Sequence, residues 1–339
     1  MTSRERVLTA LRCEEPDRVP YCELAIDRSM AQQLMGWPER PGAGDNFSPA
    51  EAKALASFLK MDNIGYALRP PIYAQTGVGL DGRVFYGDGL IKAEADLAMV
   101  QLPDPHSDAF YAGASAFARE KGDFAACLVT RIGIFPTLMG LGLETFSIAL
   151  YENRALIEAL LDRYVGWSAA IAERAASLGF DVFVSTDDMA FKSAPFFSPA
   201  VFRELVLPRY RRVAEKLKLP WVLHSDGNML PFLDDLADLG IAGFHPVERG
   251  AMDIRAVKRD YGRRLCLLGN VDLNILGMGT PGEVEAEVAG LIRDVAPGGG
   301  YIVTSGNSLA AYLRPENIRA MAEAVQRYGG YRERAIRNP

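Results

Sequence analysis

The residues best suited to chemistry in this chain stand where short apolar runs end. One run ends in His224-Ser225-Asp226, with an imidazole and a carboxylate two positions apart. Side chains two apart on a β-strand project to the same side, so His224 and Asp226 can face one point. There they can bind a divalent metal, or Asp226 can orient His224 as an acid–base group. The alternative is that Asp226 caps the following helix and His224 is a hydrogen-bonded structural residue.

Glu248 follows the next apolar run and completes a candidate metal site. It lies one strand-to-helix step further along the chain, where it can supply a third ligand or a general base. We predict that His224, Asp226 and Glu248 hold a divalent metal ion. The competing interpretation is a carboxylate at the rim, paired with Arg249 or Arg255.

Other polar residues at the ends of apolar runs are assigned by the same reasoning. The predicted catalytic set is Asp188, Asn270 and Asp272, and the predicted substrate-binding set is Asp187, His245 and Asn307. Asp187 and Asp188 are adjacent and cannot easily point to the same place, so we expect one of them to cap a helix or loop. Asn270 and Asp272 either bind a hydroxyl or carboxylate of the substrate or tie up loop backbone.

The apolar runs that precede these polar residues have the length and composition of buried β-strands. Eight of them alternate with longer helical patterns. The predicted strands are residues 19–24, 63–68, 126–131, 181–186, 221–225, 241–245, 265–270 and 301–305. The predicted helices are 48–59, 152–178, 199–217, 229–239, 281–295 and 315–328. Several helices start with proline in the first turn after a capping residue, as in Thr280-Pro281.

Eight strands with intervening helices close most economically as a barrel. We therefore predict one α/β domain over residues 1–339, a TIM-type (β/α)8 barrel with an N-terminal helical extension. In such a barrel the active site lies at the carboxyl ends of the strands, where the candidate residues stand. An open doubly wound sheet is the alternative, but no GxGxxG turn follows the first strand.

Two stretches break the alternation of strands and helices. In residues 69–105, RVFY and LIKA flank Gly87-Asp88-Gly89, which predicts a β-hairpin inserted after the second strand. Residues 36–47 are rich in glycine and proline and predict a mobile excursion near the barrel mouth. Each is either a cover for the substrate or plain decoration.

Composition and charge indicate which partners and which cellular location to expect for the protein. The chain has 339 residues, 49% hydrophobic and 24% charged, with a net charge of −6, which disfavours nucleic acid or an anionic membrane as partner. Its start is charged and amphipathic, and no run approaches about 18 apolar residues, so we expect a cytoplasmic protein. The four cysteines lack CxxC spacing. Cys266 lies within a predicted strand and is expected in the core rather than in a zinc site with His224 and His245.

At the level of longer motifs, the chain resembles the uroporphyrinogen decarboxylase superfamily, in particular its methyltransferase-like branch. The opening RERVLTALRCEEPDRVP is similar to the first helix and first strand of that family. The resemblance recurs in order along most of the chain, in FFSPAVFRELVLPRYRRV, HSDGNMLPFLDDLADLG, HPVERGAMDIRAVKRDYG, LLGNVDLNIL, GTPGEVEAEVAGLI, PGGGYIVTSGNS and RPENIRAMAEAVQRYGGY. The resemblance implies a β/α barrel, in agreement with the strand count.

The resemblance also bears on activity. Uroporphyrinogen decarboxylases carry an arginine-rich RQAGRY-type segment after the first strand, whereas this chain has CELAIDRSMAQQL, with Arg28 as its one cation. A substrate with eight carboxylates is poorly matched to that segment. The methyltransferase branch transfers methyl groups to or from a corrinoid protein, using zinc held by an HxC motif and a later cysteine. Here those positions are His224-Ser225-Asp226 and Gly306-Asn307, so both thiolates are missing.

The missing thiolates point to a different kind of zinc chemistry. A site of imidazole and carboxylates suits zinc that polarises an oxygen, as in demethylation of a methyl ether. Our preferred hypothesis is a methyltransferase that moves a methyl group between a small substrate, such as a methoxylated compound, and a separate corrinoid protein. One alternative is a metal-free decarboxylase or lyase of a small carboxylated substrate, with Asp226 or Asp272 stabilising charge. Another is a noncatalytic barrel homologue.

Overall fold

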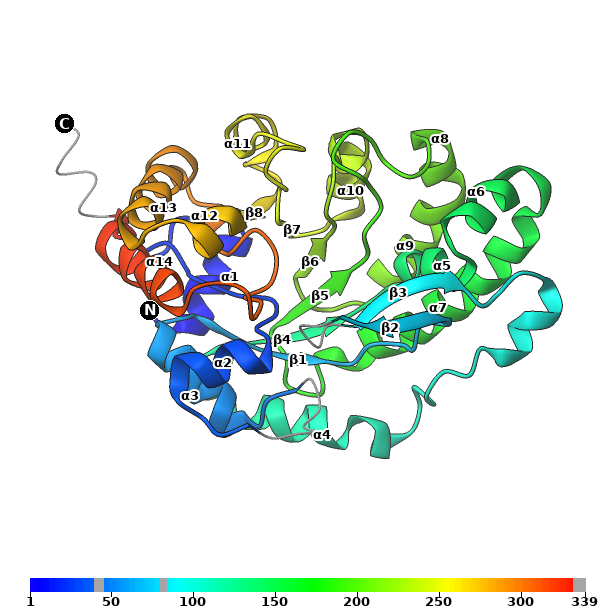
Figure 1. Cartoon of the computed structure of the whole chain (residues 1–339), viewed down its shortest axis with the longest axis horizontal. Helices are drawn as coiled ribbons and strands as arrows, with labels where there is room; N and C mark the ends of the chain where they lie inside the picture. The colour runs from blue at the N-terminus through cyan, green and yellow to red at the C-terminus, as the bar shows by residue number, and fades with distance from the viewer. Residues whose placement is uncertain (40–45, 80–83, 332–339) are drawn as a thin grey trace.

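A curled parallel sheet forms the centre of the protein (Figure 1). The computed structural model describes residues 1–39, 46–79 and 84–331. Seven strands pair in the order β1, β4, β5, β6, β7, β8, β9, and every neighbouring pair is parallel. Their bounds are β1 (Asn63–Ala67), β4 (Ala125–Thr130), β5 (Val182–Thr186), β6 (Trp221–His224), β7 (Gly243–His245), β8 (Cys266–Leu268) and β9 (Tyr301–Ile302). All seven overlap predicted strands: β4 is shifted by one residue toward the N-terminus, and the other six are shorter than predicted by one to three residues.

The segment predicted as the first strand bridges the two edges of this sheet. Tyr21 pairs in parallel with Val303, and the amide of Cys22 donates to the carbonyl of Val303 at 3.0 Å. On the other side the amide of Asp62, next to β1, donates to the carbonyl of Tyr21 at 2.7 Å. Residues 19–24 therefore lie beside β9 and the start of β1, but they form no strand of the seven-stranded sheet, and their pairing is one isolated bridge to Val303.

Alternate residues of the strands face two separate cores. One cluster joins side chains of residue 22 and of β4, β5, β6, β8 and β9 to the helix α1 (Ser3–Leu11). Within β6, Val222 belongs to this cluster, whereas Trp221 and Leu223 belong to the larger core shared with the outer helices. The first cluster fills the concave side of the sheet, as the period of two of a strand requires.

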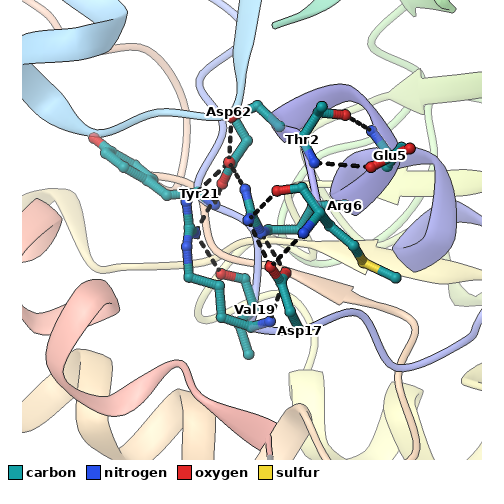
Figure 2. A network of polar contacts seen from close by, with 10 residues as sticks. Thr2, Glu5, Arg6, Asp17, Val19, Tyr21 and Asp62 are labelled. Carbon is teal, nitrogen blue, oxygen red and sulfur yellow. Dashed lines mark hydrogen bonds and ion pairs between the residues drawn. The ribbon is translucent and has the colours of Figure 1, made fainter. Parts of the chain in front are cut away.

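A network of buried ion pairs fixes α1 and the following loop to the amino ends of the strands (Figure 2). Asp62 has no exposed surface, and its carboxylate accepts from Arg6 at 2.6 Å and from Arg18 at 2.9 Å. The amide of Tyr21 donates to the same carboxylate at 3.0 Å, and Asp17 takes two further hydrogen bonds from Arg6. The N-terminal helix thus covers one end of the sheet and leaves the carboxyl ends of the strands for the site.

The remaining helices pack outside the sheet. They are α2 (Arg28–Met35), α3 (Pro49–Leu59), α4 (Asp108–Arg119), α5 (Ile134–Leu141), α6 (Leu143–Glu152), α7 (Arg154–Ala175), α8 (Pro199–Val201), α9 (Leu207–Ala214), α10 (Leu233–Leu239), α11 (Ile254–Tyr261), α12 (Leu273–Met278), α13 (Pro281–Val295) and α14 (Pro315–Tyr328), with short helical turns at Glu94–Met99, Phe202–Val206 and Leu230–Phe232. The last two long helices begin and end where predicted, and Thr280 and Glu283 form a capping box at the start of α13.

The predicted hairpin is present, but its strands differ from the prediction. β2 (Ala74–Val78) pairs antiparallel with β3 (Val84–Gly89), so Gly87-Asp88-Gly89 lies within a strand and not in the turn. The LIKA stretch forms no strand. The error arose because glycines inside a strand resemble a turn, and Gly89 packs so close to the backbone of Leu141 that a side chain would clash at 2.2 Å. Of the predicted excursion at 36–47, residues 40–45 lie outside the described residues.

None of the described helices is by itself long and apolar enough to cross a membrane. α5 and α6 reach that length and apolar character only together, as a pair bent by 100°.

Candidate functional site

Three potential metal ligands converge at the carboxyl ends of β5 and β6. The Nε2 atom of His224 lies 3.5 Å from Oδ1 of Asp188 and 4.0 Å from Oδ1 of Asp226. One ligand atom from each residue lies within 4.8 Å of the others, and this Asp188–His224–Asp226 cluster could hold a metal ion. His224 and Asp226 point to the same place, as their spacing on a strand predicts.

The 3.5 Å between Nε2 of His224 and Oδ1 of Asp188 is close to the separation of two ligand atoms on a small divalent cation. Tetrahedral zinc with bonds of about 2.1 Å separates its ligand atoms by about 3.4 Å. Oδ1 of Asp226 is buried and makes no hydrogen bond within the described part of the chain. A buried carboxylate oxygen without a donor is costly unless a cation or a proton satisfies it. The donor set and the unsatisfied oxygen therefore fit a metal.

His245 contacts the ring nitrogen of His224 that does not face the cluster. Residues 224 and 245 pair across β6 and β7, and their Nδ1 atoms are 2.7 Å apart. His245 has no exposed surface, and burial, with the nearby charge of His224, lowers its pKa well below the usual value. Neutral His245 can accept the Nδ1 proton of His224 and leave Nε2 for a metal. The sequence predicts that His245 binds substrate, and the structure places its buried ring in contact with His224.

Asp226 is held on its other oxygen by Asn307. The Nδ2 atom of Asn307 donates to Oδ2 of Asp226 at 2.7 Å. Burial raises the pKa of Asp226 to about 6, against the lowering effect of His224, and Asp188 and Glu248 raise it further. Asn307, predicted to bind substrate, thus makes its hydrogen bond to a member of the cluster.

Asp188, predicted as catalytic, occupies the place predicted for Glu248. Oδ1 of Asp188 accepts from the amide of Asp226 at 3.1 Å, which turns its carboxylate toward His224. Glu248 lies nearby but accepts from the amide of Gly227 at 2.6 Å and is 3.7 Å from Lys192. Neither Arg249 nor Arg255 pairs with Glu248. Arg249 binds Glu287, and Arg255 binds Asp294.

The neighbouring Asp187 has a structural role. It has no exposed surface and accepts from the amides of Ile132 at 2.6 Å, Gly133 at 3.1 Å and Phe135 at 3.2 Å. It thereby caps the start of α5, as expected for one member of the adjacent pair. The role in substrate binding stays a prediction for Asp187, and in the structure its carboxylate accepts from these three backbone amides.

Asp272 and Asn270, both predicted as catalytic, make hydrogen bonds to loop backbone in the structure. Asp272 caps α12 by accepting from the amide of Asn274 at 2.8 Å, and lies 3.6 Å from Arg249. Asn270 is 4% exposed and donates from Nδ2 to the carbonyl of Val247 at 2.6 Å. The structure gives both residues positions in the loops beside the cluster, and neither joins it.

Glu23 is a residue that sequence reasoning missed. It is 3% exposed, and burial raises its pKa to about 8 against the lowering effect of hydrogen bonds from Ser305. Its Oε1 accepts from the amide of Ser305 at 3.0 Å, and its Oε2 lies 2.6 Å from the Ser305 hydroxyl. The signal in the sequence was an acid inside the apolar run of the first predicted strand.

A cavity of about 470 Å³ adjoins Glu23 at the carboxyl end of β1. Its wall combines polar side chains, such as Asn63 and Arg28, with apolar ones from α3 and β4, such as Leu55 and Val129. A volume of this size accommodates a small organic molecule.

Comparisons with known proteins agree with this architecture. The family model for uroporphyrinogen decarboxylase (URO-D) matches residues 91–328. A uroporphyrinogen decarboxylase from Pseudomonas fluorescens is 25% identical over 300 residues, covering 83% of this chain and 79% of that protein. The methylcobamide:CoM methyltransferase MtaA from Methanosarcina barkeri is 28% identical over 188 residues, covering 56% of this chain and 54% of that protein.

Among solved structures, a methyltransferase from Methanosarcina mazei superposes with a TM-score of 0.77 at 21% identity, covering 97% of this chain and 99% of that one. That likeness shows the fold. The family model spans well over half of the chain and includes the strand ends that carry the cluster. The chain therefore belongs to the uroporphyrinogen decarboxylase family.

Proposed function

We propose that this protein is a zinc-dependent methyltransferase that moves a methyl group between a small substrate, such as a methoxylated compound, and a separate corrinoid protein. The proposal takes residues 1–339 as a single (β/α)8 barrel in which residues 19–24 serve as the eighth strand. The observation that carries it is the Asp188–His224–Asp226 cluster, with the unpartnered Oδ1 of Asp226 facing His224. The MtaA relative, named as a methyltransferase, supports the reaction class.

The ligand types decide which methyl transfer is favoured. The cluster, as found among the described residues, contains one imidazole and two carboxylates and no thiolate. When bound there, zinc supplies Lewis acidity toward an oxygen of the substrate. In demethylation of a methyl ether the carbon–oxygen bond breaks, the electron pair of the reduced Co(I) corrinoid forms the new bond to the methyl carbon, and the oxygen keeps the electron pair of the broken bond and takes a proton from water.

The residues of the chain have distinct tasks in this reaction. His224, Asp188 and Asp226 would hold the metal, in place of the predicted set with Glu248. His245 fixes the tautomer of His224 through the 2.7 Å contact between their Nδ1 atoms. Ligand histidines held in this way lose metal affinity when the supporting partner is removed.

The first test is metal content. We expect about one zinc per chain in protein purified without chelator, and loss of that zinc in His224→Ala and Asp226→Ala variants. Glu248→Gln is the comparison, since Glu248 lies outside the cluster and its replacement should retain zinc. Protein with far less than one zinc per chain, unchanged in the His224→Ala variant, would reject the metal site.

The second test is turnover. Free reduced cobalamin and a panel of methoxylated aromatic compounds are mixed with the enzyme, and formation of methylcobalamin is followed by absorbance. The zinc-loaded protein should transfer the methyl group, and chelation should abolish transfer until zinc is restored.

A metal-free decarboxylase is the second candidate, because several relatives are named uroporphyrinogen decarboxylase. It predicts release of carbon dioxide from a small carboxylated substrate in the presence of chelator. The same protein preparations separate the two functions, since one requires the metal and the other survives its removal.

A further inference from the structure

A chain of hydrogen bonds connects Glu23, on the wall of the cavity, to the metal-binding cluster. Glu23 binds the amide and hydroxyl of Ser305, and the Ser305 hydroxyl lies 2.9 Å from the carbonyl oxygen of Asn307. Asn307 in turn donates to Asp226 at 2.7 Å. The loop after β9, which contains Ser305 and Asn307, thus connects Glu23 to Asp226, one ligand of the proposed metal.

The orientation of the Asn307 amide is fixed at both ends. Its Oδ1 accepts from the amide of Ser308 at 2.8 Å, so its Nδ2 must be the atom that faces Asp226. A carboxylate that accepts a strong hydrogen bond on Oδ2 has one oxygen left for other partners. That oxygen is Oδ1, which lies 4.0 Å from Nε2 of His224 and has no hydrogen-bond partner among the described residues.

The hydroxyl of Ser305 connects Glu23 to Asn307 within this series of hydrogen bonds. A hydroxyl has one proton to donate, and two oxygens, Oε2 of Glu23 and the carbonyl of Asn307, lie within reach. Both contacts are satisfied when Glu23 is protonated, because Glu23 then donates to Ser305 and Ser305 donates to Asn307. Protonated Glu23 therefore holds the loop after β9 in the position seen here.

We infer that Asn307, held by hydrogen bonds that begin at Glu23, is a positioning residue that directs Asp226 toward the metal. This inference rests on the proposed function, since it assumes that the cluster binds zinc. It assigns to Asn307 a task other than contact with the substrate. It also predicts that the buried acid at position 23 affects the metal through hydrogen bonding and not through charge.

The experiment measures metal binding rather than turnover. Zinc dissociation constants are obtained by competition with a chromophoric chelator, and the visible spectrum of the Co²⁺ form reports the geometry around the ion. We expect Asn307→Ala to weaken zinc binding by about 10- to 100-fold and to alter the Co²⁺ spectrum. Asn274→Ala is the matched control, because Asn274 makes the same amide-to-carboxylate contact with Asp272 outside the cluster.

Two substitutions of Glu23 separate hydrogen bonding from charge. In Glu23→Gln the amide can donate to the Ser305 hydroxyl and accept from the Ser305 amide, so zinc affinity should stay within about threefold of wild type. Glu23→Ala removes both contacts and should weaken binding about tenfold. Asn307→Ser serves in place of Asn307→Ala if the latter does not fold.

The outcomes distinguish the two proposals. Wild-type protein that binds no zinc overturns the proposed function and this inference together. Wild-type protein that binds zinc, with an Asn307→Ala variant of equal affinity and identical Co²⁺ spectrum, overturns the positioning role alone. A Glu23→Gln variant as weak as Glu23→Ala would show that the charge at position 23 matters, against the inference.

Discussion

Replacement of Glu23 by glutamine should stabilise the protein at neutral and alkaline pH. Glu23 is buried, and its pKa is raised to about 8 from an ordinary value of 4.5. Glutamine has nearly the same shape and reproduces the hydrogen bonds of the protonated acid to Ser305. The unfolded chain ionises Glu23 at a lower pH than the folded protein does, and this ionisation favours unfolding. The substitution removes that effect.

The sign and size of the effect follow from the two pKa values. Below pH 4.5 the acid is protonated in both states, so the wild type and the Glu23→Gln variant should be equally stable. Between pH 4.5 and about 8 the unfolded state loses a proton that the folded state keeps, and wild-type stability falls by about 1.4 kcal/mol per pH unit relative to the variant. The variant should thus be more stable by about 3 kcal/mol at pH 7 and about 5 kcal/mol above pH 8.

Urea unfolding followed by fluorescence at several pH values between 4.5 and 9 measures this difference. Glu120→Gln, at the exposed end of α4, is the control for removing one surface charge. A Glu23→Gln variant that is less stable than wild type at pH 8, or whose difference from wild type does not change with pH, would refute the reasoning. Either result would mean that Glu23 is ionised in the folded protein.

Three further substitutions test other parts of the structure. Asp62→Ala leaves Arg6 without its buried partner and should cost about 3 to 5 kcal/mol in urea unfolding. Asp187→Ala removes the cap of α5 and leaves buried amides unsatisfied. The free energy of unfolding at pH 7 should therefore fall by about 2 kcal/mol or more. A fall of less than about 0.5 kcal/mol would contradict the capping role. His245→Phe should weaken zinc binding by about 10- to 100-fold in chelator competition, and unchanged affinity would show that His224 needs no support.

The sequence predicted the strand positions and the convergence of His224 with Asp226, because both follow from local rules. Strand periodicity placed the two side chains on one side, and proline in the first turn placed the starts of α13 and α14, with Thr280 as the cap of α13. Those rules act over a few residues, which is the range that a single sequence reveals.

The third member of the cluster could not be predicted in the same way. Asp188 follows β5 and Glu248 follows β7, and both strands pair with β6. The sequence offers no reason to choose between the two acids. The choice depends on the path of two loops. In the structure Asp187 anchors its loop to α5, which turns Asp188 inward, while the amide of Gly227 takes up Glu248. Glu23 and Ser305 meet across 282 residues, a contact that no local pattern encodes.

The buried acids at the amino ends of the strands and the two carboxylates of the cluster have different ionic partners, and the contrast supports a ligand at the site. At the amino ends, buried Asp62 and Asp181 pair with Arg6, Arg18 and Lys121. At the carboxyl ends, neither Asp188 nor Asp226 pairs with an arginine or lysine among the described residues, and their ionic partner is His224.

Neighbouring carboxylates of like charge raise one another's pKa, as Asp188 does for Asp226, and so destabilise the ionised site. A fold that can place cations beside its acids at one end has the means to do so at the other. Asp188 and Asp226 lie beside an imidazole without an arginine or lysine partner among the described residues, so a bound cation would balance their charge. A divalent metal supplies that charge.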